Sequence, residues 1–200
     1  MISLGTWFWL MVAFFALIGM MRGWTKEIIV TSALVLSLFF LNQFGAQLVS
    51  LMGNVSDPAL LAVDPLVGRR RQFYILTIAH VFFAFWGYQG PTLAGSRLSE
   101  RLRVRDSLQD KVLGAVVGAI NGYLVFGTIW VFLEYTIIAA GQWQPLDPGA
   151  MYPFSTAVLT RPTLEMGLAG LIQKLPLPTL SPYLPFLVVI VFLFVIIVMI

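Results

Sequence analysis

The sequence contains no cysteine, a single histidine and few charged residues. Without cysteine the chain forms no disulfide, offers no thiol nucleophile and cannot ligate an iron–sulfur cluster through thiolates. One histidine, His80, excludes a metal site built from several imidazoles. Charged residues make up 10% of the chain, whereas they make up about 25% of ordinary soluble domains. Because 59% of the residues are hydrophobic, we expect lipid rather than water to surround much of the protein.

Motifs of soluble enzymes are also missing. The sequence shows no nucleotide-binding loop, nucleophile triad, paired carboxylates or metal-ligand spacing. The glycines of residues 90–96, GPTLAGS, are not followed by Lys-Ser/Thr and follow no strand, so they are not a phosphate loop. We therefore expect a protein that is not an enzyme. The net charge of +3 does not indicate nucleic-acid binding, because the basic residues cluster at the ends of apolar runs, where they anchor helices to lipid headgroups.

Five apolar segments stand out along the chain. Four of them, at roughly 4–21, 28–52, 73–93 and 112–140, reach the length of about 20 residues that crosses a bilayer. The fifth, at 184–200, has seventeen residues and is predicted to be a short span. The sequence thus predicts an all-α integral membrane protein with four transmembrane helices, a fifth at the C-terminus and one interfacial amphipathic helix.

The predicted interfacial helix lies in a proline-rich loop. We divide the chain into a four-span domain at 1–140, this loop at 141–183 and the C-terminal span, and the loop holds seven of the eleven prolines. Within it, residues 160–175 have an N-cap in Thr160, first-turn residues in Pro162 and Glu165, and a stop in Pro176. The apolar face of this helix is expected either on the membrane interface or on the protein's own spans.

Basic residues in the connections indicate the orientation. With the N-terminus outside, seven of them lie on the inner side: Arg22, Lys26, Arg97, Arg101, Arg103, Arg105 and Lys111. Five lie on the outer side: Arg69, Arg70, Arg71, Arg161 and Lys174. The excess favours an N-out, C-in protein, although the arginine triplet opposes it.

A tight interfacial turn is predicted between the first two spans. Arg22 ends the first span, where its side chain reaches headgroup phosphates and the last carbonyls of the helix. Gly23 can adopt the positive φ that closes a helix. Glu27 opens the next span, where its charge meets the positive end of the helix dipole, and an Arg22–Glu27 contact is within reach.

A stripe of small residues marks the fourth span. In the segment GAVVGAINGY, residues 114–123, the residues Gly114, Gly118 and Gly122 fall on one helical face. In lipid, such a stripe lets another helix approach closely, and the adjacent Asn121 can form a hydrogen bond across the contact. We therefore predict a helix-packing surface rather than a ligand site.

Together these two motifs resemble those of the colicin V production protein (CvpA-like) family. The family joins its first two spans by an Arg-Gly-aromatic-x-x-Glu turn and places an acidic and a basic residue before Gly-x-x-x-Gly-x-x-x-Gly. The matching residues outside the stripe are Gly19, Arg22, Gly23, Trp24, Glu27, Asp110 and Lys111. Family members commonly carry Arg where this chain has Asn121. The resemblance covers roughly residues 1–140 and implies a bacterial inner-membrane protein linked to colicin V production or export and to envelope maintenance.

His80 is predicted to lie in the middle of the third span. One interpretation is a packed histidine that forms a hydrogen bond to a neighbouring helix. The other is a neutral imidazole that ligates bacteriochlorophyll or another tetrapyrrole. Antenna helices usually have Ala four residues before such a histidine, whereas this chain has Leu76. A proton relay through His80 has no partner that the sequence reveals.

Other polar residues lie near the ends of the spans. Glu134 lies about 33 Å along the fourth span from Val112 at 1.5 Å per residue, so we expect an interfacial carboxylate beside Trp130 and Tyr135. The alternative is a buried carboxylate with a raised pKa. At the end of the second span, three polar residues are expected at the interface or in bonds between helices: Asn42, Gln43 and Gln47.

Three functional hypotheses follow. The first is a non-catalytic inner-membrane protein in secretion or envelope homeostasis. The second is an accessory subunit of a larger photosynthetic or respiratory complex, because the spans are rich in Phe and Trp, contain His80 and include a short fifth helix. The third is a small transporter, with Asn121, His80 and Glu134 as its only inward polar groups. The expected partners are the lipid bilayer and other transmembrane helices, either in a homo-oligomer or in a larger membrane complex.

Overall fold

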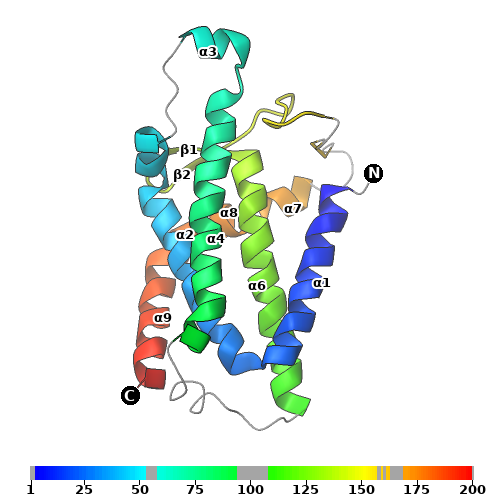
Figure 1. The fold of residues 1–200 in the computed structure, drawn as a ribbon, viewed down its shortest axis with the longest axis vertical. Helices are drawn as coiled ribbons and strands as arrows, with labels where there is room; N and C mark the ends of the chain where they lie inside the picture. The colour runs from blue at the N-terminus through cyan, green and yellow to red at the C-terminus, as the bar shows by residue number, and fades with distance from the viewer. Residues whose placement is uncertain are drawn as a thin grey trace.

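Helices dominate the architecture (Figure 1), which confirms the predicted all-α class. The computed structural model describes residues 3–52, 58–93, 108–156, 159, 161–162 and 169–199. The long helices are α1 (Leu4–Arg22), α2 (Trp24–Met52), α4 (Val67–Leu93), α6 (Leu108–Glu134) and α9 (Leu184–Met199). The short elements are α3 (Pro58–Val63), β1 (Tyr135–Ala139), β2 (Gln142–Pro145), α7 (Ala169–Gln173), α8 (Pro176–Leu180) and the 3-10 helix η2 (Ser181–Tyr183).

Four helical segments of the described chain are long and apolar enough to cross a membrane: α1, α2, α6 and Pro176–Phe194, which contains α8, η2 and most of α9. The predicted third span lies in α4, which has 27 residues but is not among the four, because polar residues such as His80 and Gln89 interrupt its apolar run. By length and apolar composition, three described helices rather than the predicted four qualify as spans before the C-terminal one. Even so, α4 runs alongside α2 and also contacts α6 (Figure 1).

The glycine stripe of α6 lies against α1. A Cβ atom on Gly118 would collide with the carbonyl oxygen of Phe15, and one on Gly114 would collide with the carbonyl oxygen of Gly19. A Cβ atom on Gly122 would come within 2.8 Å of the Cβ atom of Phe15. The two backbones therefore touch along this contact, which leaves no room for a side chain on the stripe.

The predicted fourth span ends six residues earlier than expected. Helix α6 stops at Glu134, and β1 then pairs antiparallel with β2, with Tyr135 opposite Pro145. Gly141, at a φ of 71°, makes the turn of this hairpin. The stretch 136–138, Thr-Ile-Ile, is apolar enough to extend a helix, but its β-branched residues favour a strand.

The hairpin docks on α2 through Asn42. The indole of Trp143 donates to Asn42 Oδ1 at 3.0 Å, and the amide of Gly141 donates to the Asn42 carbonyl at 2.7 Å. Ser181 Oγ also donates to Asn42 Oδ1, at 2.9 Å. Asn42 is therefore buried and joins three parts of the chain, so of the two positions expected for it the bonded one is observed. Gln43 is half-buried and Gln47 is exposed.

Part of the helix predicted at 160–175 falls within the described residues, and it is helical at 169–173. Arg161 and Pro162 are not helical, α7 covers Ala169–Gln173, and residues 160 and 163–168 lie outside the described chain. The segment after α7 packs into the bundle, where the Pro176 ring fills the space beside Gly127 and Tyr123 Oη donates to the Lys174 carbonyl at 2.5 Å. Gly127 lies seven residues, about 10 Å, before the end of α6. Of the two expectations, packing on the protein's own spans is therefore the one observed for this segment.

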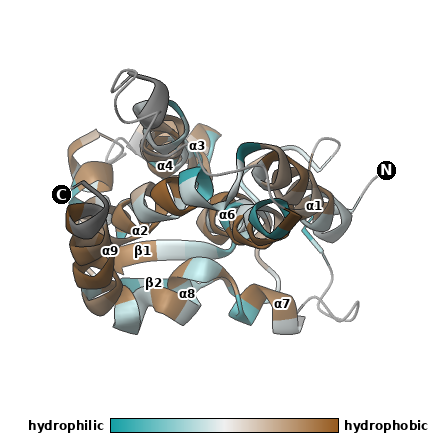
Figure 2. Ribbon diagram, turned by 90° about the horizontal axis from the view of Figure 1, so that it is seen from below, coloured by the Kyte–Doolittle hydropathy of each residue, from teal (hydrophilic) through white to brown (hydrophobic). Residues whose placement is uncertain are grey.

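Large apolar side chains cover the outside of the bundle. Figure 2 shows α9 as almost wholly hydrophobic, and its Phe186, Val189 and Phe192 are exposed, as are Trp9 and Phe14 on α1. Such a surface is stable in lipid but not in water. The chain is thus a multi-pass membrane protein in contact with lipid. Its two termini lie at opposite ends of the bundle (Figure 1).

Candidate functional site

Buried polar side chains gather at two ends of the bundle, with His80 between them. We call the group at the α1–α2 junction the turn cluster: Arg22, Glu27, Thr31, Tyr88 and Asn121. We call the group beside the hairpin the hairpin cluster: Arg69, Trp130, Glu134, Tyr152 and Arg161. A polar group inside a membrane is costly unless it is paired, so these clusters are the first candidates for function.

The turn cluster is built on the junction predicted from Arg22, Gly23 and Glu27. Gly23 has a φ of 84° and donates its N–H to the Gly19 carbonyl at 2.9 Å, which closes α1. Helix α2 begins at the next residue and places Glu27 in its first turn. The guanidinium of Arg22 then lies 3.0 Å from Glu27 Oε1, and the Glu27 side chain is fully buried. The contact that the spacing allowed is therefore present.

Asn121 links α6 to this ion pair. Its Nδ2 donates to Glu27 Oε2 at 2.8 Å and to the Glu27 carbonyl at 3.0 Å. Its Oδ1 accepts from Thr31 Oγ1 at 2.7 Å. The residue is fully buried, and its amide uses both its donor and its acceptor sides. Asn121 thus acts between α6 and α2, while the glycines beside it face α1.

Tyr88 and Asp110 complete the contacts around the turn. Tyr88 Oη donates to Glu27 Oε2 at 3.3 Å, and the Arg22 guanidinium lies 4.5 Å from the centre of the Tyr88 ring, a cation–π geometry. Asp110 Oδ1 accepts from the Trp24 N–H at 3.2 Å. Both sequence motifs therefore meet in one buried cluster, in which the formal charges of Arg22 and Glu27 cancel.

His80 lies inside the helix packing between the two clusters. Its Nδ1 is 2.8 Å from Ser37 Oγ on α2, and its ring meets the Phe132 ring of α6 edge to face at 6.2 Å. Ser37 is the partner that the sequence did not reveal. The imidazole is fully buried, so a tetrapyrrole would have to displace packed helices to reach it. The pigment hypothesis stays a prediction, and this packing disfavours it.

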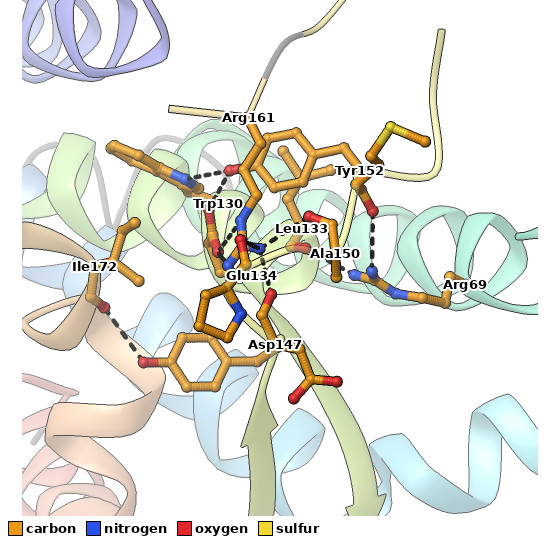
Figure 3. Close-up of polar contacts among 12 residues, drawn as sticks. Arg69, Trp130, Leu133, Glu134, Asp147, Ala150, Tyr152, Arg161 and Ile172 are labelled. Carbon is orange, nitrogen blue, oxygen red and sulfur yellow. Dashed lines mark hydrogen bonds and ion pairs between the residues drawn. The ribbon is translucent and has the colours of Figure 1, made fainter. Parts of the chain in front are cut away.

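The hairpin cluster centres on Glu134, which is 1% exposed rather than interfacial. Arg161 donates to Glu134 Oε2 from Nε at 3.1 Å and from a terminal nitrogen at 2.8 Å. Tyr152 Oη bonds to Glu134 Oε1 and accepts from the indole N–H of Trp130 at 3.1 Å (Figure 3). Burial and the nearby Glu134 carboxylate raise the pKa of Tyr152 well above its usual range, so its hydroxyl stays a neutral donor.

Arg161 also forms hydrogen bonds to the backbone of the loop that follows β2. Its other terminal nitrogen donates to the carbonyls of Asp147 at 2.7 Å and Ala150 at 2.9 Å. From the opposite side, Arg69 donates to the Leu133 carbonyl at 2.8 Å and to the Met151 carbonyl at 3.4 Å (Figure 3). The end of α6 and the loop that follows β2 are thus joined through two arginines.

The sequence profile of the Colicin V production protein family matches residues 6–166. The chain belongs to the colicin V production protein family. The match confirms the resemblance and extends it beyond residue 140, so that it includes the hairpin and Arg161 of the hairpin cluster. Searches of curated proteins and of solved structures gave no match.

The sequence pointed to Glu27 of the turn cluster and to Glu134 of the hairpin cluster, but it did not reveal all of the residues that bond to them. Arg161 was expected only as a positive charge in a loop, and Tyr152 and Ser37 carried no signal, because hydroxyl groups in loops and spans are common. Glu134 was the one clue to the hairpin cluster, since a carboxylate near the end of an apolar run needs a partner if it is buried. Within the described residues no group of three or more His, Cys, Asp or Glu side chains gathers as a metal site.

Proposed function

We propose that this member of the colicin V production family is a non-catalytic protein of the bacterial inner membrane that acts in secretion or envelope homeostasis. The family supplies the link to colicin V production. The observation that supports a non-catalytic role is the turn cluster, in which Glu27 is bonded to Arg22, Tyr88 and Asn121 on three other helices. Arg22 and Glu27 of the first motif thus pair with each other and, through Tyr88 and Asn121, join four helices.

This pairing favours an architectural role over a reactive one. A catalytic carboxylate must reach a substrate, whereas Glu27 is fully buried and surrounded by its own protein. Breaking a buried ion pair is also expensive, which makes the cluster suited to hold α1, α2, α4 and α6 in one arrangement. We infer that the protein acts through the surface that this arrangement presents to lipid and to partner proteins.

The proposal is tested by deleting the gene and restoring it with variants. We expect the deleted strain to lose colicin V export or tolerance to envelope stress, and the wild-type gene to restore it. Asn121→Leu is expected to restore it poorly, and the lipid-facing Ile120→Leu fully. Normal export and stress tolerance in the deleted strain, with collapse of an energy-transducing complex, would favour the accessory-subunit alternative instead.

The orientation is proposed to be N-out and C-in. The termini at opposite ends of the bundle agree with this arrangement, and the inner side then carries the excess of basic residues. Reporter fusions at both ends test it, with a periplasm-active reporter working only at the N-terminus. The same activity at both ends would contradict the proposal.

A homo-oligomer or a larger complex remains a prediction for the outer surface. The glycine stripe is occupied by α1 of the same chain, so it is not free to bind a second copy. The exposed side chains of α9 need only lipid for their burial. Purification from native membranes with mass spectrometry of the co-purifying chains, and a visible spectrum, separates these possibilities.

A further inference from the structure

A cavity opens beside the hairpin cluster, where α2 ends and α4 begins. Its volume is about 420 Å³, within the range of about 300–1,000 Å³ that is typical of small-molecule sites. We call it the Arg69 pocket, and the lining residues that matter here are Ser50, Leu61, Arg69, Gln72, Ile137 and Ile138. Its lining residues come from the end of α2, from α3, from the start of α4 and from β1.

Arg69 is the charged residue of this lining. Its terminal nitrogens donate to the neutral carbonyls of Leu133 and Met151, and its Nε is buried without a hydrogen-bond partner. In the described part of the chain no carboxylate forms an ion pair with Arg69. The guanidinium is thus held in place by the backbone while its charge remains uncompensated.

The carboxylates near Arg69 are already paired with other arginines. Arg70 pairs with Asp64 at 2.8 Å, and Arg161 pairs with Glu134 at 2.8 Å. The charge of Glu134 also acts on Arg69, but Glu134 is already paired with Arg161, and no other described carboxylate pairs with Arg69. A partly buried charge without a counterion is unfavourable, and a bound anion relieves that cost.

Apolar side chains form part of the remaining lining, beside the polar Ser50, Gln72 and Thr136. Ile137 is buried in the wall, whereas Leu61 and Ile138 are exposed at the mouth. Leu51 and Met52, the last residues of α2, are also exposed beside Ser50. The end of a transmembrane helix lies at the depth of lipid headgroups. A cation above an apolar wall at this depth fits a molecule with an anionic head and an apolar tail.

We propose that the Arg69 pocket binds an anionic amphiphile, with the phosphate or carboxylate head on Arg69 and the apolar part along Leu61 and Ile138. This site goes beyond the proposed function and does not depend on it. The head supplies the missing counterion for the guanidinium, while the tail covers the apolar side chains at the mouth. A small inorganic anion satisfies only the first of these needs.

Native mass spectrometry of the purified full-length protein tests the proposal. The probes are phosphatidylglycerol, phosphatidylcholine with the same acyl chains, oleate and inorganic phosphate. We expect the wild type to retain one anionic amphiphile about tenfold more strongly than phosphatidylcholine, the size of effect that one charge-assisted bond gives. Arg69→Gln should lose this preference, whereas Arg71→Gln, an exposed arginine outside the pocket, should keep it.

A second pair of variants covers the case in which Arg69→Gln does not fold. Ser50 is exposed on the pocket lining, so Ser50→Glu places a negative charge opposite the anionic head, and Ser50→Gln controls for size. Ser50→Glu should weaken retention while Ser50→Gln retains it. Equal retention by these two variants, or by the wild type and a folded Arg69→Gln, would overturn the proposal, as would a wild type with no preference over phosphatidylcholine or with equal binding of phosphate alone.

The two amphiphiles distinguish the sources of the ligand. Preferential retention of phosphatidylglycerol identifies a bilayer lipid, and preferential retention of oleate identifies a free monoacyl amphiphile. Both results support the same site. Loss of binding in Arg69→Gln with intact complementation of the deleted strain would leave the proposed function untouched, so the two proposals fail separately.

Discussion

Asn121 donates its side-chain amide to the buried carboxylate of Glu27, 2.8 Å away, across the contact between α6 and α2. The two residues are 94 positions apart in the chain, and each belongs to a different family motif. In this chain their bond joins the two motifs in space: the junction of α1 and α2 buries a carboxylate, and α6 supplies a donor for it.

Asn121→Leu should destabilise the protein because Glu27 Oε2 loses its 2.8 Å donor and keeps only the longer bond from Tyr88. Loss of a hydrogen bond to a buried charged group costs about 1.5–3 kcal/mol. The loss is measured as a lower unfolding temperature in detergent. Ile120→Leu changes a lipid-facing neighbour and serves as the control. An unchanged unfolding temperature for Asn121→Leu would show that the cluster does not stabilise the fold.

Gly118→Leu should separate α1 from α6, because any Cβ atom at this position collides with the Phe15 carbonyl. Overpacking a tight contact costs about 1–3 kcal/mol and often more when backbone must move. Limited proteolysis and thermal unfolding measure the effect. Gly149→Ala is the control, since nothing lies within 4 Å of a Cβ atom there. If Gly118→Leu stays as compact and stable as the control, the stripe is not a tight contact.

Arg161→Gln should destabilise the hairpin end, because it leaves the Glu134 carboxylate buried and unpaired. Such losses are about 3–5 kcal/mol. The double variant Arg161→Gln/Glu134→Gln removes both charges and should recover part of this stability. A double-mutant cycle from thermal unfolding gives the coupling between the two residues. Additive effects would mean that the ion pair contributes no coupling energy.

Tyr152 should ionise only at a pH well above that of an exposed tyrosine. Its pKa is raised by burial and by Glu134, so the folded state favours the neutral hydroxyl. The stability that this group contributes is complete below its unfolded pKa of about 10 and decreases as the pH rises toward the folded pKa. Tyrosinate absorbance, recorded as a difference between wild type and Tyr152→Phe, follows this single group. A difference spectrum that titrates near the ordinary tyrosine pKa of about 10 would contradict the raised pKa.

Ser37→Ala should remove the partner of His80 Nδ1 in the middle of the bundle. A buried imidazole nitrogen left without a bond costs about 1–3 kcal/mol. Ser32→Ala is a matched control, because the Ser32 hydroxyl bonds only to the Ile28 carbonyl of its own helix. The difference in unfolding temperature between the two variants isolates the bond between the helices. Equal temperatures would indicate that His80 finds another partner.

Short-range patterns were sufficient for the turn and for the presence of the long helices. Gly23 between Arg22 and Glu27 specifies a closed helix end and an oppositely charged pair, because both depend on residues a few positions apart. The apolar runs specify helices in lipid for the same local reason. The residue at which α6 ends could not be predicted from short-range patterns. A short apolar run with β-branched residues is compatible with either a longer helix or a strand, and local preferences distinguish the two only weakly. Docking of the hairpin on Asn42 decides for the strand.

The sequence by itself determined a multi-pass helical membrane protein, its family motifs and the small-residue stripe, because composition and helical periodicity are local properties. Only the tertiary structure decided which buried polar groups meet. It joined Asn121 to Glu27, Arg161 to Glu134 and Ser37 to His80, and among the described carboxylates it paired none with Arg69. The physical reason is that a hydrogen bond depends on positions in space to within a fraction of an ångström, and residues far apart in the chain reach such positions only through the packing of whole helices.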